Sequence, residues 1–206
     1  MGSEMCIRDR FGVRYIIAPM VETPYALSKY IAAKGKIYSD LEREDVTFLF
    51  NVETSTAFDN IEAMVQLAAK NPGCDGVVFG RVDFSGSLGL GREGIETEQV
   101  TSAGEAVARL CKDHGLEFVV GGAVSSDALV SLRRFNDVHL DRFETRKVVF
   151  KAAALGEKNL PDALRQAVHF ELLWLLNKRD YYGVMHHEDQ TRIQMLESRW
   201  KVLEQN

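Results

Sequence analysis

The sequence has few cysteines, no long apolar run and no excess of basic residues, and each of these absences excludes a class of protein. Its three cysteines lie far apart without the spacing of metal ligands, which is typical of a reducing compartment such as the cytoplasm. No apolar run reaches the roughly 20 residues that a membrane-spanning helix needs. A net charge of −5 gives no basic footprint for nucleic acid. We therefore expect a cytoplasmic protein that binds neither membranes nor nucleic acids.

The first ten residues stand apart from the rest of the chain. Residues 1–10 show no periodicity, and they resemble the in-frame translation of a transposon-type sequencing adapter. Such a segment is excluded from reasoning about the fold, as a cloning scar would be. The alternative is a natural disordered N-terminus. On the adapter interpretation, Phe11 begins a truncated fragment, and the natural protein has more sequence upstream.

From Phe11 onward, short apolar runs alternate with segments of helical periodicity. The predicted strands are residues 13–19, 46–52, 76–79, 116–120 and 138–141. The predicted helices are residues 23–33, 55–70, 98–114 and 126–135, and the segment after the fifth strand, through residue 154, is also predicted to be helical. Residues 80–97 are predicted to form a glycine-rich loop. About five strand–helix units in series imply a parallel sheet. That sheet is either an open doubly wound sheet or part of an eight-unit barrel.

The C-terminal part of the sequence, residues 156–206, is predicted to be a helical extension. Residues 160–177 and 189–204 carry apolar stripes at helical spacing, which predicts two helices. These stripes could pack against the rest of the domain. They could equally form an exchanged or oligomer-forming tail, because exposed apolar helices need a partner. We expect the full-length protein to be a homo-oligomer.

Two neighbouring predicted strands run into carboxylates. The strand at residues 46–52 ends at Glu53, and the next runs through Gly80 to Asp83. Parallel strands deliver their C-terminal ends to one face, so these side chains could converge there. Two carboxylates and water suit Mg²⁺ or Mn²⁺, which can hold the keto oxygen of a 2-oxo acid. The amides of Val82 and Asp83 could then bind the substrate carboxylate. Alternatively, either acid caps a helix or pairs with a lysine.

Further polar residues follow the same strands. A cation at Arg81, beside the expected metal, could engage a second carboxylate or a phosphate, or it could be a solvated loop residue. Residues 141–146 place several charges after the fifth predicted strand. Those charges could lie at the rim of the site, although an ion-pair cluster is the simpler interpretation.

Residues 51–89 resemble the HpcH/HpaI aldolase and citrate lyase beta family, and the resemblance is good from about residue 16 to residue 124 and thinner to residue 154. The upstream residues 18–23 look like the family's Pro-Met-Val-Glu strand end. The matching motifs are Glu53-Thr54, Asp59-Asn60-Ile61, Pro72-Gly73-Cys74-Asp75-Gly76, Gly80-Arg81-Val82-Asp83-Phe84-Ser85 and Ser87-Leu88-Gly89. The resemblance implies a (β/α)8 barrel, of which residues 11–155 would supply about the last five units.

The same resemblance implies a set of site residues. Glu53 and Asp83 would be the magnesium or manganese ligands, and pyruvate or a larger 2-oxo acid would bind that metal and the amides beside Asp83. The remaining expected substrate-binding residues are Val82, Asn51, Arg81, Pro19 and Met20. A catalytic arginine and the catalytic base are expected upstream of Phe11.

These inferences predict a metal-dependent class II aldolase or lyase that cleaves a carbon–carbon bond to release a pyruvate-like 2-oxo acid. On this reading, the fragment alone would be inactive. The alternatives are another phosphoenolpyruvate- or pyruvate-utilising enzyme, such as one of the pyruvate kinase type, and a 2-oxo-acid-binding barrel without catalysis. A plain open sheet in which both acids only cap helices also remains possible on pattern alone.

Overall fold

The fold is built on one six-stranded sheet whose strands follow one another in chain order. The computed structural model describes residues 12–203, with the side chains of residues 12–198. Strands β1 to β5 are parallel, and β6 pairs with β5 in the antiparallel direction. The strands are β1 Tyr15–Ala18, β2 Thr47–Val52, β3 Gly76–Gly80, β4 Glu117–Gly121, β5 Arg142–Glu144 and β6 Val149–Lys151.

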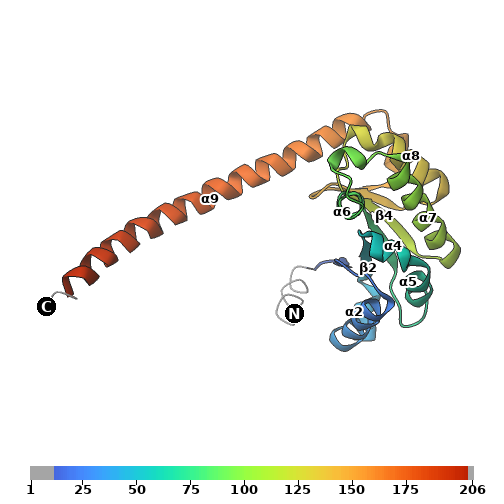
Figure 1. Cartoon of the computed structure of the whole chain (residues 1–206), viewed down its shortest axis with the longest axis horizontal. Helices are drawn as coiled ribbons and strands as arrows, with labels where there is room; N and C mark the ends of the chain where they lie inside the picture. Colours follow the sequence, from blue (N-terminus) through green and yellow to red (C-terminus); the bar gives the residue numbers. More distant parts are fainter. Residues whose placement is uncertain (1–11, 204–206) are drawn as a thin grey trace.

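The helices of the body cover one face of this sheet, and α9 extends away from it (Figure 1). The α-helices are α2 Pro24–Ile37, α3 Asp40–Glu44, α4 Ser55–Asp59, α5 Ile61–Ala68, α6 Arg81–Ser87, α7 Glu98–His114, α8 Leu129–Val138 and α9 Leu160–Leu203. Three short 3-10 helices are η1 Arg92–Gly94, η2 Ser126–Ala128 and η3 Ala152–Gly156. The parallel strands joined by helices are those of an α/β fold.

Alternating strand residues give the sheet two different faces. Phe50, Phe79 and Phe118 belong to the large core formed with the helices. Leu49, Val78 and Val119 form a separate small cluster, against which Ile17 packs. The second cluster lies on the other face of the sheet, because its residues alternate with those of the first.

The sheet is curled like half of a barrel toward the face without helices. The Arg142 guanidinium on β5 lies 4.3 Å from the centre of the Tyr15 ring on β1. Three strands separate β1 from β5, so a flat sheet would hold them roughly 19 Å apart. Because two side chains standing on a flat sheet could not meet over that distance, the strands must curve around a concave face.

Several predicted elements agree closely with the structure. Helix α7 has the predicted bounds, and it ends at Gly115, which adopts the left-handed conformation at φ +68°. Thr23 caps α2 through a hydrogen bond from the Ala26 amide, as its place before Pro24 predicted. The first four predicted strands contain β1 to β4 to within a residue at the C-terminal end.

The fifth strand was predicted wrongly. Helix α8 continues through Val138, and β5 starts only at Arg142, so residues 138–141 do not form a strand. Strand β5 escaped detection because two of its three residues are charged and only Phe143 faces the core. Strand β6 was not predicted at all, and the segment up to residue 154 is not an α-helix.

Three helical predictions also need correction. Residues 80–97 are not all loop, since α6 forms at Arg81–Ser87. The helix predicted at residues 55–70 is two helices, separated at Asn60, whose side-chain amide donates to the carbonyl oxygens of Glu22 and Thr56. The two C-terminal helices are one continuous helix, α9, which passes through Gly183 without a break.

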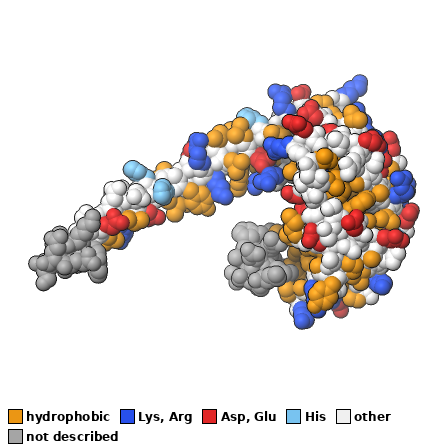
Figure 2. Space-filling view, viewed as in Figure 1, with side chains coloured by type: hydrophobic (Ala, Val, Ile, Leu, Met, Phe, Trp, Pro, Cys, Tyr) orange, Lys and Arg blue, Asp and Glu red, His pale blue; other side chains and the backbone are white. Residues whose placement is uncertain are grey.

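Helix α9 is attached to the body by its first turns. Leu160, Leu164 and Ala167 are buried, and the Lys147 ammonium lies 5.5 Å from the centre of the Trp174 ring. Farther along, many large apolar side chains are exposed, and Figure 2 shows them along the arm. Within residues 12–203, no helix is both long and apolar enough to cross a membrane.

The adapter interpretation of residues 1–10 concerns a segment outside the described residues and stays a prediction.

Candidate active site

A cavity of about 1010 Å³ opens on the concave face at the C-terminal ends of the strands. Its walls bring together residues from seven separate segments of the chain. Of the residues predicted from sequence, the cavity is lined by Pro19, Asn51, Glu53, Val82 and Asp83. The two carboxylates that were expected to share one site therefore face one cavity. The first turns of α9 contribute Val168 and Glu171 to its wall.

Glu53 is held in place by two hydrogen bonds. Its side chain is only 6% exposed. The backbone N–H of Met20 donates to Oε1 at 2.8 Å, and the side-chain amide of Asn51 donates to Oε2 at 3.0 Å. The Met20 side chain was expected to line the pocket, but it is 58% exposed, and it is the backbone that serves the site. Met20 adopts a φ of +52°, a conformation that costs energy for a residue with a β-carbon.

Two glycines form the floor of the cavity on adjacent strands. Gly80 on β3 and Gly121 on β4 are partners in the sheet register, and both line the cavity. A β-carbon at Gly80 would lie 2.8 Å from Glu53 Cβ and 3.1 Å from its Oε2. A β-carbon at Gly121 would lie 3.3 Å from Glu144 Oε1. The absence of side chains at these two positions is therefore what lets two carboxylates lie over the sheet.

Asp83 and Val82 lie in the first turn of α6, directly after β3. Gly80 precedes that helix and gives it no side-chain cap. The first amides of a helix lack partners within the helix, so they are free to bind an anion or water. Gly122, with φ +86°, packs against this turn so closely that a β-carbon would lie 2.8 Å from the Val82 nitrogen. The end of β4 is thus fitted to the start of α6.

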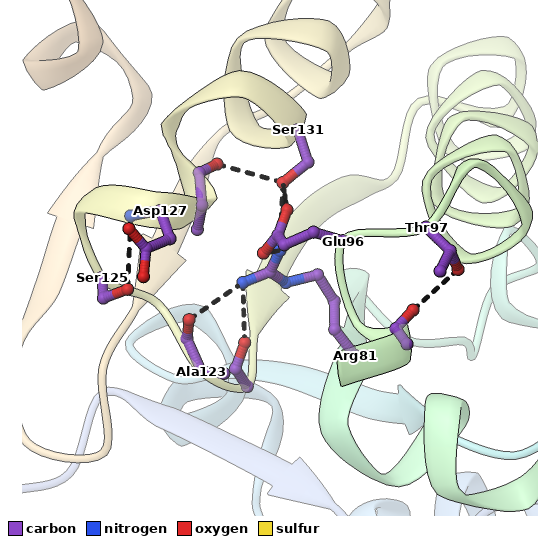
Figure 3. Close-up of polar contacts among 10 residues, drawn as sticks. Arg81, Glu96, Thr97, Ala123, Ser125, Asp127 and Ser131 are labelled. Atoms are coloured by element: carbon purple, nitrogen blue, oxygen red, sulfur yellow. Dashed lines mark hydrogen bonds and ion pairs between the residues drawn. The ribbon is translucent and has the colours of Figure 1, made fainter. Parts of the chain in front are cut away.

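Arg81 is not among the residues that line the cavity, and Figure 3 shows its side chain directed toward Glu96, Ser131 and Ala123. Its side chain is 0% exposed, and Nη1 donates to Glu96 Oε1 at 2.6 Å and to Ser131 Oγ at 3.0 Å. Nη2 donates to the carbonyl oxygens of Gly122 at 2.8 Å and Ala123 at 3.2 Å. Burial lowers the pKa of Arg81, and the Glu96 carboxylate opposes that effect. The guanidinium that was expected to bind substrate instead holds the backbone after β4.

The donor atoms of the cavity fit a hard divalent cation. Glu53 and Asp83 supply carboxylate oxygens, and Asn51 adds a buried side-chain oxygen, Oδ1, that has no hydrogen-bond partner. Among the described residues, no group of three or more His, Cys, Asp or Glu side chains could hold a metal. One or two carboxylates with water and substrate oxygens suffice for Mg²⁺, however. The chemistry of this donor set therefore fits a hard divalent cation.

Glu144, at the end of β5, is a cavity residue that the sequence did not single out. Burial raises the pKa of its carboxyl group, and the nearby Arg142 guanidinium opposes that shift. Residues 141–146 were recognised as charged, and both suggested roles occur within them. Arg142 pairs with Glu117, whereas Glu144 and Arg146 line the cavity. Assigning the ion-pair role to Arg142 and the cavity role to Glu144 and Arg146 requires the correct position of β5, which was predicted wrongly.

Comparisons with known proteins agree with this arrangement. The sequence profile described as HpcH/HpaI aldolase/citrate lyase matches residues 2–131, a span that includes Glu53 and Asp83 and overlaps residues 1–10. No curated protein sequence matches significantly.

Three solved structures illustrate the similarity of fold. The citrate synthase SbnG has a TM-score of 0.56 at 18% identity, over 84% of this chain and 66% of its own. An HpcH/HpaI aldolase from Desulfitobacterium hafniense DCB-2 has a TM-score of 0.52 at 15% sequence identity, over 75% of this chain and 64% of its own. An HpcH/HpaI aldolase/citrate lyase family protein from Burkholderia cenocepacia J2315 has a TM-score of 0.51 at 22% sequence identity, over 79% of this chain and 66% of its own.

The chain thus spans just under two thirds of the length of these structures, and at such identities the likeness concerns the fold. Family membership rests on the sequence profile, because its matched span covers more than half of the chain. The profile and the fold lead to the same assignment: the chain belongs to the HpcH/HpaI aldolase/citrate lyase family.

Proposed function

We propose that this chain carries the metal- and substrate-binding half of a divalent-metal-dependent carbon–carbon lyase that acts on a pyruvate-like 2-oxo acid. One observation supports this above all. Glu53 and Asp83, from the ends of neighbouring strands, line a single cavity together with the unpartnered oxygen of Asn51. Acids that served only to cap helices would not need such a cavity between them.

Each residue has a role in this proposal. Glu53 and Asp83 would hold Mg²⁺ or Mn²⁺, which would polarise the 2-oxo group and favour negative charge on its oxygen. The Met20 amide and Asn51 orient the Glu53 carboxylate. The amides of Val82 and Asp83 bind the substrate carboxylate, and Pro19 forms part of the wall. Arg81 has no direct part, because its guanidinium is engaged by the protein.

The reaction is cleavage of the bond between C3 and C4 of a 4-hydroxy-2-oxo acid. The bonding electrons pass to C3, the C4 hydroxyl loses its proton, and an aldehyde or ketone leaves. Protonation of C3 then gives the 2-oxo acid. An arginine near the 2-oxo group and the remaining strands of an eight-stranded barrel belong, in this proposal, to sequence preceding Phe11. The exposed apolar side chains of α9 suit the expected homo-oligomer.

Titration with Mn²⁺, followed by electron paramagnetic resonance of the free ion, tests the site in the 206-residue chain. We expect binding by the wild type that pyruvate strengthens, and binding at least about tenfold weaker in E53Q and D83N, a loss of roughly 1.4 kcal/mol or more. Glu157 is exposed and does not line the cavity, so E157Q is a control of matched charge.

Equal Mn²⁺ affinity in all four proteins would contradict the metal site. Binding of metal and pyruvate without cleavage of any 4-hydroxy-2-oxo acid, by a protein that includes the upstream sequence, would instead support the non-catalytic 2-oxo-acid-binding barrel.

A further inference from the structure

The concave face carries a second carboxylate opposite Glu53. Glu144 lies over Gly121 in the way that Glu53 lies over Gly80, and the two glycines are register partners on β4 and β3. Glu53 Oε2 lies 3.1 Å from the place of a β-carbon at Gly80, and Glu144 Oε1 lies 3.3 Å from the place of one at Gly121. Because neighbouring strands are about 4.8 Å apart, these two carboxylate oxygens are at most roughly 11 Å from each other. A small 2-oxo acid fits between them, over a floor without side chains.

Glu144 differs from Glu53 in how its carboxylate is engaged. Both oxygens of Glu53 accept hydrogen bonds. Within residues 12–198, the structure gives the Glu144 carboxylate no hydrogen-bond donor and no ion-pair partner. Its neighbour Arg142, two residues away on the same strand, is bound to Glu117 and stacked on Tyr15. A carboxylate that faces a cavity and is not bound by the protein is free to act on a ligand.

On these grounds, which include the proposed lyase function, we propose that Glu144, in place of the base expected upstream of Phe11, is the catalytic acid–base of the cavity. Its carboxylate accepts the proton of the C4 hydroxyl as the bond between C3 and C4 breaks. The carboxylic acid so formed then gives that proton to C3 of the enolate, which yields the 2-oxo acid and restores the carboxylate. One proton is taken and one returned, so no other reactant is needed.

The electrostatic surroundings of Glu144 agree with this role. Burial raises the pKa of its carboxyl group above that of an ordinary glutamate, which makes its carboxylate a stronger proton acceptor. Charged groups reach the cavity from several other elements. They are Glu53 beside β2, Asp83 on α6, Arg92 on η1, Arg146 after β5 and Glu171 on α9. The carboxylates among them favour the protonated form of Glu144, and the arginines favour the ionised form.

Exchange of the methyl hydrogens of pyruvate for deuterium in D₂O tests the proposal, because it needs only removal and return of a proton at C3. A protein that includes the upstream sequence is incubated with Mg²⁺ and pyruvate, and the mass of pyruvate is followed. We expect exchange by the wild type and by E157Q, and a loss of about 100-fold or more in E144Q. Mn²⁺ affinity and thermal unfolding show separately whether E144Q retains its metal site and fold.

Each outcome decides the matter. Exchange by E144Q at the wild-type rate would overturn the assignment of Glu144 and leave the lyase proposal standing. Binding of Mn²⁺ by the wild type without any exchange would likewise overturn it. Failure of the wild type to bind Mn²⁺ would reject the metal-dependent function itself, and the role of Glu144 with it. If E144Q unfolds, E144D replaces it, and exchange at the wild-type rate in a folded E144A would also contradict the role.

Discussion

The Glu53 side chain lies directly against the backbone of Gly80, with only 2.8 Å between Glu53 Cβ and the place where a β-carbon would stand. G80A should therefore push the carboxylate away from its hydrogen bonds with Met20 and Asn51. We expect Mn²⁺ affinity to fall by about tenfold or more, or ~1.4 kcal/mol. G91A is the matched control, since a β-carbon there meets no atom within 4 Å and the backbone is not left-handed. Equal affinities in the two variants would refute the steric argument.

The buried guanidinium of Arg81 joins three segments around the site. R81M should destabilise the protein by about 3 kcal/mol, because Glu96 loses its partner and two carbonyl oxygens lose their donor. The Glu96 side chain is 37% exposed, so water compensates part of the loss. Chemical denaturation measures this, with the exposed Arg109 changed to Met as control. A cost for R81M no greater than that for R109M would show that the network contributes little.

Tyr15 and Arg142 contact one another across the concave face, and their interaction reports on the curl of the sheet. A double-mutant cycle with Y15L and R142M should give a coupling free energy of about 0.5–1 kcal/mol, the range of partly exposed cation–π pairs. Tyr15 is 46% exposed, which places this pair toward the lower end. Strictly additive effects in urea denaturation would mean that the two strands do not face each other in solution.

The raised pKa of Glu144 predicts two pH dependences of opposite direction. As a base, Glu144 works when ionised, so pyruvate exchange should rise with pH and level off above its raised pKa. Stability should change the other way. Between the ordinary glutamate pKa of about 4.3 and the raised value, the folded state holds more protons than the unfolded state. Raising the pH through that window therefore destabilises the wild type.

E144Q provides the measurement of this effect. It should show neither change in the same window, so its free energy of unfolding relative to the wild type should increase as the pH rises through it. Denaturation curves at several pH values measure this difference. A constant difference across the window would mean that the carboxyl group titrates at its ordinary pKa.

The sequence predicts the metal-binding side of the site better than the proton-transfer side, for a physical reason. Glu53 and Asp83 end apolar strands, and the rule that parallel strands present their C-terminal ends together brings them to one cavity. Glu144 belongs to a strand of three residues with a single core side chain, and so short a strand has no hydrophobic pattern. Its distance from Glu53 along the chain also conceals that both stand over neighbouring glycines.

The other differences between the predicted and the observed structure arise mainly from contacts between residues that lie far apart in the sequence. The position of Arg81 at a strand end gives no sign that its guanidinium pairs with Glu96 and Ser131, which are 15 and 50 residues away along the chain. The split at Asn60 depends on a hydrogen bond to Glu22, 38 residues earlier. The gap predicted between residues 177 and 189 contains Gly183, but one glycine costs only about 1 kcal/mol inside a helix, so α9 continues through it.

That continuity gives α9 a mechanical property. A single helix of 44 residues is about 66 Å long and behaves as a stiff lever, with its fulcrum in the buried turns around Leu164. Val168 and Glu171, just beyond the fulcrum, border the cavity. The end of α9 lies roughly 59 Å beyond Leu164, so a tilt of about 10° would swing it through roughly 10 Å, and a shift of about 1–2 Å beside the cavity is magnified severalfold along the helix.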